Sequence, residues 1–116
     1  MATPSTTFIT PPLSRVGLSE REAREAGHDV VVKKKDIAAI AAMPRARITE
    51  ETRGLIKVVV DAESDQVLGA TLFCVDSQEL VNLVALAIRT GASASQLRDG
   101  IWTHPSSTEA FNEVLK

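Results

Sequence analysis

Cysteine is almost absent from the 116-residue chain, which has only Cys74, within the apolar run VLGATLFCV. A single cysteine cannot form a disulfide within the chain or a cysteine-rich metal site. Because its neighbours are apolar, we expect a buried and unreactive thiol. We therefore expect neither an internal disulfide nor a metal site.

Long apolar runs and basic blocks are missing as well. No apolar stretch reaches the roughly 20 residues that cross a bilayer, and the opening MATPSTTFITPP lacks the apolar run of a secretory signal. Thirteen Lys and Arg against fifteen Asp and Glu give a formal net charge of −2, with no basic block that could follow a phosphate backbone. We expect a cytoplasmic protein that binds neither membrane nor nucleic acid.

The few glycines also exclude two kinds of site. The six glycines form neither a GxGxxG motif nor a phosphate-binding loop, and no G-x-S-x-G nucleophile motif occurs. What remains is the composition of one globular domain, 44% hydrophobic and 24% charged. A chain of this size buries roughly two-thirds of its unfolded surface, which is enough for a core of its own.

Helix and strand signals follow one another from the first residues. Residues 1–12 are rich in threonine and proline, which favours an extended strand or linker. Ser19 as N-cap, with Glu22 three positions later, predicts a short helix that Gly27 ends. His28 then follows the helix end, and we expect it to be an exposed cap residue.

The middle of the chain predicts an antiparallel sheet. The β-branched residues 30–32, followed by three lysines, predict a strand at a sheet edge with the lysines in solvent. Residues 37–48 mix alanines with a proline and are expected to be irregular or strand. The runs LIKVVVD and VLGATLFCV, separated by AESDQ, predict an antiparallel hairpin.

A long helix is predicted by DSQELVNLVALAIRTG, beginning at Asp76 or Ser77 and ending at Gly91. Its apolar residues leave only a narrow polar stripe, so it should be covered on more than one side. The second cover could be another chain, a missing domain or flanking loops. A short helical turn, a loop and a last helix follow, which completes an α+β domain.

The stretch WTHPSSTEAF, residues 102–111, supports two interpretations. Ser106 as N-cap and Glu109 at the third helical position form a capping box worth about 1 kcal/mol, with Pro105 fixing the helix start. Alternatively, Glu109 accepts the Nδ1 proton of His104, and Nε2 is left to act as an acid and base. The spacing alone leaves both open.

Four stretches occur in order: FITPPLSRVGLSEREAREAG, GLIKVVVDAESDQVLGATL, QELVNLVALAIRTG and HPSSTE. Together they resemble the C-terminal dimerisation domain of the pyridine nucleotide-disulfide oxidoreductases, the flavoprotein family of glutathione reductase and dihydrolipoamide dehydrogenase. The resemblance covers residues 8–115, and its details are most similar to the reactive-chlorine-resistance branch. It implies that residues 13–116 are the dimerisation domain of a larger flavoenzyme and that residues 1–12 lead into it.

The resemblance also implies a homodimer in which each subunit lends a histidine to the other's active site. His104 matches that acid/base, Glu109 matches its orienting partner, and the His104–Pro105 backbone matches a contact with the partner's FAD. The FAD- and NAD(P)-binding domains and the redox-active cysteine pair would lie upstream. We therefore expect no cofactor in this chain and no activity from it alone.

Two other functions are weighed against this one. The first is a free-standing dimerisation or regulatory module, in which Glu109 only caps its helix. The second is a hydrolase that uses His104, which is disfavoured because no nucleophile or metal cluster accompanies that histidine.

Overall fold

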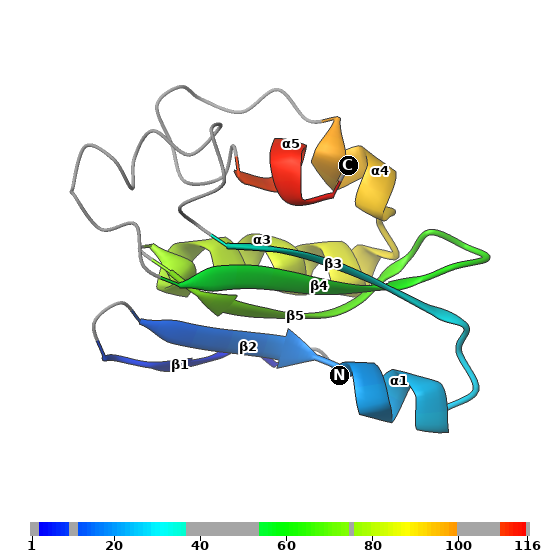
Figure 1. Cartoon of the computed structure of the whole chain (residues 1–116), viewed down its shortest axis with the longest axis horizontal. Helices are drawn as coiled ribbons and strands as arrows, with labels where there is room; N and C mark the ends of the chain where they lie inside the picture. The colour runs from blue at the N-terminus through cyan, green and yellow to red at the C-terminus, as the bar shows by residue number, and fades with distance from the viewer. Residues whose placement is uncertain (1–2, 10–11, 37–53, 75, 100–109, 116) are drawn as a thin grey trace.

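The computed structural model describes residues 3–9, 12–36, 54–74, 76–99 and 110–115 (Figure 1). Five strands form one sheet: β1 (Ser5–Thr7), β2 (Leu13–Gly17), β3 (Val30–Asp36), β4 (Leu55–Asp61) and β5 (Val67–Phe73). The described helices are α1 (Glu20–Glu25), α3 (Ser77–Thr90), α4 (Ala94–Arg98) and α5 (Ala110–Val114). The predicted α+β class is confirmed, whereas the prediction for residues 37–48 falls outside the described residues.

The sheet has the order β1-β2-β5-β4-β3, and every neighbouring pair is antiparallel. The predicted hairpin is β4–β5, whose register shifts between Val59 and Val60. As predicted, β3 is an edge strand; Lys34 is exposed, while Lys33 and Lys35 are half-buried. Charged residues on an edge strand discourage pairing with another chain.

Alternation along the strands gives the sheet two apolar faces of unequal size. Ile56, Val58 and Val60 are buried in the larger cluster, with residues of α3, α4 and α5. Val59, between them in the sequence, lies in the smaller cluster with Ala23 and Val30. Successive strand residues point to opposite faces, so the larger core lies between the sheet and the three later helices. Figure 1 shows α3 along the sheet and α1 at one end of it.

Helix α1 begins and ends as its sequence predicts. The Ser19 hydroxyl accepts the N–H of Glu22 at 3.1 Å, and the Glu22 carboxylate accepts the N–H of Ser19 at 3.0 Å. At the other end Gly27 adopts φ 91°, and the N–H of His28 reaches the carbonyl of Ala23 at 3.1 Å. This left-handed turn is the helix ending that glycine favours.

Helix α3 begins and ends at the predicted residues, but its first turn is not capped by a side chain. Gly91 closes it with φ 70°, and Asp76 is its N-cap. The Asp76 side chain makes no capping hydrogen bond, however, and its backbone is left-handed with φ 63°. The hydroxyl of Ser77, the other predicted cap, instead donates into the protein, to the carbonyl of Pro12 at 2.9 Å.

The Ser77 hydroxyl is one end of a series of three hydrogen-bonded hydroxyl groups. Ser77 Oγ lies 2.9 Å from Ser14 Oγ, which lies 2.8 Å from Thr6 Oγ1. Since the single Ser77 hydrogen is given to Pro12, Ser14 donates to Ser77 and Thr6 donates to Ser14. Ser14 and Ser77 are fully buried. These hydrogen bonds join β1 and β2 to the start of α3.

Candidate functional site

The predicted site residues His104, Pro105 and Glu109 lie outside the described residues. Their roles therefore stay predictions, as does the cap role of Ser106. The structure does describe the two elements that lead into and out of this stretch. They are α4, which ends at Arg98, and α5, which begins at Ala110.

The start of α4 is capped twice. Ser93 and Gln96 form a capping box, with bonds of 3.1 and 2.8 Å. From the β4–β5 turn, the Asp65 carboxylate accepts the backbone N–H of Ser95 at 3.0 Å and its hydroxyl at 2.5 Å. The hydroxyl and then the N–H of Ser95 hold the pKa of Asp65 below its usual value. A carboxylate at a helix N-terminus is the favourable arrangement.

Helix α5 is held by its apolar side chains. Phe111, Val114 and Leu115 are buried in the larger core, together with Ala94 and Leu97 around α4. A helix of five residues is too short to persist in water alone, so this burial is what stabilises it. A polar contact also joins the two helices: the Asn112 side-chain amide donates to the carbonyl of Arg98 at 2.7 Å.

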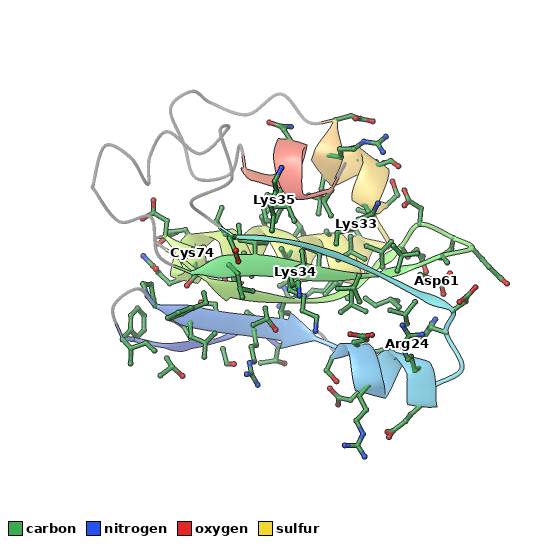
Figure 2. The ribbon with its side chains drawn as sticks, in the orientation of Figure 1. Arg24, Lys33, Lys34, Lys35, Asp61 and Cys74 are labelled. Atoms are coloured by element: carbon green, nitrogen blue, oxygen red, sulfur yellow. The ribbon has the colours of Figure 1, made fainter. Side chains whose placement is uncertain are left out.

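Cys74 is buried and free, as predicted. Burial, and to a smaller extent the nearby Asp76, raises the pKa of its thiol to about 12. The thiolate is the reactive form of cysteine, so this side chain is not a nucleophile at neutral pH. Figure 2 shows Cys74 at the end of the sheet opposite Asp61.

The prediction that His28 is exposed is wrong. Its Nδ1 lies 2.7 Å from Asp61 Oδ2, and its side chain is 35% exposed. The backbone position just past α1 agrees with the prediction, but β4 brings Asp61 beside it from 33 residues away. The N–H of Ser64, then His28 and the N–H of Glu63, lower the pKa of Asp61 to about 2. This pair closes the turn after α1 and has no other titratable partner in the described contacts.

Nucleotide cofactors often place phosphates at helix N-termini. Within the described part of the chain, acidic side chains already stand at three of these ends: Glu22 at α1, Asp76 at α3 and Asp65 at α4. A phosphate there would be repelled. These three helix ends therefore do not suit the phosphates of a flavin or nicotinamide nucleotide.

A groove of about 710 Å³ is likewise unsuited to a nucleotide cofactor. Its walls include Leu18, Leu68 and Ile88, and its charged residues are Glu22 and Arg89. One arginine opposed by one glutamate does not suit a pyrophosphate. Across residues 3–9, 12–36, 54–74, 76–99 and 110–115, no group of three or more His, Cys, Asp or Glu could hold a metal ion. No helix in these ranges is long and apolar enough to cross a membrane.

Most of the apolar surface of α3 is buried by the rest of the chain, but part of it is exposed. Leu80, Val81 and Val84 are buried by the chain itself. Leu83 and Ile88 are only partly buried, and Leu86 is 54% exposed. The sheet and its neighbours therefore cover most of the helix and leave an apolar residue in solvent.

Known proteins match this chain along nearly all of its length. Residues 3–115 match the family described as pyridine nucleotide-disulphide oxidoreductase, dimerisation domain. Over 112 residues the chain is 48% identical to the probable pyridine nucleotide-disulfide oxidoreductase RclA of Escherichia coli K12, covering 97% of this chain and 25% of that protein. It is 37% identical to dihydrolipoyl dehydrogenase of Mycobacterium tuberculosis, with 97% and 24% covered. It is 34% identical to mercuric reductase of Bacillus cereus, with 83% and 15% covered.

A solved structure agrees with the sequence matches. The HOCl-induced flavoprotein disulfide reductase RclA from Escherichia coli superposes with a TM-score of 0.91 at 46% identity, covering 98% of this chain and 26% of that chain. The chain thus spans about a quarter of the length of these two RclA matches. It belongs to the pyridine nucleotide-disulfide oxidoreductase family, of which it constitutes the dimerisation domain.

Proposed function

We propose that this domain forms the homodimer of an FAD- and NAD(P)H-dependent disulfide oxidoreductase and supplies His104, oriented by Glu109, to the partner subunit's active site. The observation that carries the proposal is the family match over residues 3–115, a span that contains both side chains. The firmly packed α4 and α5 on either side of this stretch support it, because a catalytic group needs a rigid frame.

The proposed role of His104 is to move the proton of a dithiol. The imidazole accepts a thiol proton, and the resulting thiolate attacks a disulfide sulfur. A new S–S bond forms while the old one breaks, and the imidazolium returns the proton to the leaving thiolate. Glu109 accepts the Nδ1 proton of His104, which leaves Nε2 directed at the sulfur. Cys74, buried with a pKa of about 12, is not one of these thiols.

FAD and NAD(P)H belong, in this proposal, to other domains of the longer enzyme. The acidic groups at the ends of α1, α3 and α4 support that division. The domain itself would comprise residues 13–116, with residues 1–12 leading into it and the His104–Pro105 backbone facing the partner's flavin. Leu86, exposed on α3, is an apolar group that a second copy could cover.

Two histidine variants of the full-length enzyme test the catalytic role. His104→Ala should slow reoxidation of the reduced enzyme by its substrate by about 100-fold or more, the range of general acid/base catalysis. Flavin reduction by NAD(P)H should stay unchanged, because that half-reaction needs no thiol proton transfer. His28→Ala is the matched control and should leave both half-reactions intact. Equal reoxidation rates in wild type and His104→Ala would remove the proposal.

Hybrid dimers test whether the histidine acts on the other subunit. One subunit carries His104→Ala, and the other lacks the redox-active cysteine pair. If the histidine acts in trans, one of the two sites in each hybrid is complete, so a purified hybrid dimer should have about half of the wild-type activity. A histidine acting within its own subunit leaves both sites defective. A hybrid as inactive as its two parents would contradict the in-trans role. The role would also be contradicted if this domain proved to be a free-standing module.

A further inference from the structure

The groove of about 710 Å³ lies beside the start of the first strand. Three of its wall residues come from the sheet and the long helix: Gly17 ends β2, Leu68 is in β5 and Ile88 is in α3. Thr3, two residues before β1, also lines it. The groove therefore adjoins the point at which the described chain enters the sheet.

The sequence explains why the chain lines a groove here instead of continuing a strand. β1 pairs with β2 from Ser5, which lies opposite Arg15. The same antiparallel register would bring Thr3 beside Gly17, but Pro4 has no backbone N–H and cannot extend the ladder. Within the described residues β2 thus extends past the start of β1, and the groove opens at that step.

The walls have the chemistry of a surface that binds protein. Leu18, Leu68 and Ile88 are half-buried, so each leaves apolar surface uncovered. Glu22 and Arg89 are exposed and opposite in charge, so the groove favours neither an anion nor a cation. Apolar area accompanied by a few polar groups is the composition of an interface between folded units. We therefore expect a polypeptide in the groove.

Resting on the function proposed above, we propose that this groove is the docking site of the upstream domains of the same subunit. The chain spans about a quarter of the RclA protein that it matches, and the proposed function places the FAD- and NAD(P)-binding domains before Thr3. A domain joined to the chain at Thr3 is tethered to the groove wall, which gives it a high effective concentration there. A second copy or a free molecule lacks this tether.

Docking at the groove sets how the cofactor domains are oriented relative to the dimerisation domain. A single chain connection leaves two domains free to move against each other. Contacts with Leu68 of β5 and Ile88 of α3 add fixed points on two elements of the core. The groove therefore supplies an orientation that the connection at Thr3 alone does not.

Hydroxyl-radical footprinting shows whether the groove is covered in the full-length enzyme. The oxidation rates of the Leu68 and Ile88 side chains are measured by mass spectrometry and normalised to an added reporter peptide. Both should be oxidised in the 116-residue chain and severalfold more slowly in the full-length enzyme. Equal rates in the two proteins would overturn the inference. That result would leave the proposed function standing, because the half-reactions of His104→Ala are measured separately.

Two further samples identify the occupant of the groove. In the 116-residue chain alone, oxidation should not slow as the concentration is raised; slower oxidation would assign the groove to a second copy. In a purified hybrid of one isotope-labelled 116-residue chain and one full-length subunit, only the partner has upstream domains. The labelled groove should stay reactive there, and protection would assign it to the partner's domains. Either assignment would overturn the inference.

Gln66→Trp tests the groove by filling it. Gln66 is an exposed wall residue, and its hydrogen bonds with Asp61 and Ser64 are made by its backbone. The variant chain should therefore keep its urea midpoint, whereas a protease should cut the connection before Thr3 severalfold faster in the full-length variant. Glu63→Trp, in the same β4–β5 turn but outside the groove, is the matched control and should change neither. An unchanged cutting rate for Gln66→Trp would contradict docking at this groove.

Discussion

The buried hydroxyl chain gives a sharp test of the packing between the first strands and α3. Ser77→Ala removes the donor to Pro12 and also the acceptor for Ser14. The hydroxyl hydrogen of Ser14 then loses its acceptor at a fully buried position, and it can find another only by reversing its hydrogen bond with Thr6. An orphaned buried donor costs about 1–3 kcal/mol. The Pro12 carbonyl suffers less, because it still accepts the N–H of Cys74 at 3.2 Å.

The donor direction along these three hydroxyl groups predicts the order in which single substitutions lower the stability. Thr6→Val removes only the donor to Ser14, leaves a lone pair unfilled and preserves the shape of the side chain, so the loss should be about 0.5–1 kcal/mol. Ser14→Ala should fall between the two. In the double variant Ser14→Ala with Ser77→Ala no fully buried hydroxyl is orphaned, and the Thr6 hydroxyl, which loses its acceptor, is only half-buried. The cost of the double variant should therefore be smaller than the sum of the single costs.

Urea unfolding of the chain, followed by circular dichroism, measures these differences as shifts in the midpoint at constant slope. Domains of this size are stable by about 5–15 kcal/mol, so a change of 1–3 kcal/mol is readily resolved. Equal losses for Ser77→Ala and Thr6→Val would refute the assigned direction. Additive losses for the two serines would refute their hydrogen bond.

Two further predictions follow from the titrating groups. The thiol of Cys74, with its pKa raised to about 12 by burial, should not react with a disulfide reagent such as DTNB in the folded chain and should react fully in urea; fast reaction without denaturant would contradict its burial. The pKa of Asp61 is lowered from 3.8 to about 2, so the folded state resists protonation and the stability that Asp61 contributes is present above about pH 4 and lost as the pH falls through about 2. Asp61→Asn should therefore flatten the decline of the urea midpoint between these pH values, and an unchanged decline would show that other carboxylates cause it.

Features set by neighbouring residues were predictable from the sequence. The capping box of Ser19 and Glu22, the glycine endings of α1 and α3, and the β4–β5 hairpin all involve residues close in the chain. The lysines within β3 indicate an edge strand by the same kind of local signal. Local chemistry is enough here because each feature satisfies backbone groups within one or two turns.

Features that join distant residues were not predictable. The sequence predicts a simple cap role for His28, because nothing near it in the chain points to Asp61. A serine before an apolar run is usually a helix cap, which predicts that role for Ser77. Its hydroxyl instead bonds to Pro12 and Ser14, which come from more than 60 residues earlier. In the candidate site, the spacing of His104 and Glu109 is compatible with both a helix cap and an acid/base pair. Only the family resemblance favours the acid/base pair.

The strand order has a consequence for how the chain folds during synthesis. Leu13 of β2 pairs with Phe73 of β5, so the ribosome must add about 60 residues before the first hairpin has a neighbour in the sheet. At about 5–20 residues per second, that wait lasts several seconds. Pairing between distant strands is also the slow kind. A nascent chain therefore holds β4 and β5 together before β1 and β2 can join them, and the hairpin nearest the start of the domain is the last part of the sheet to be secured.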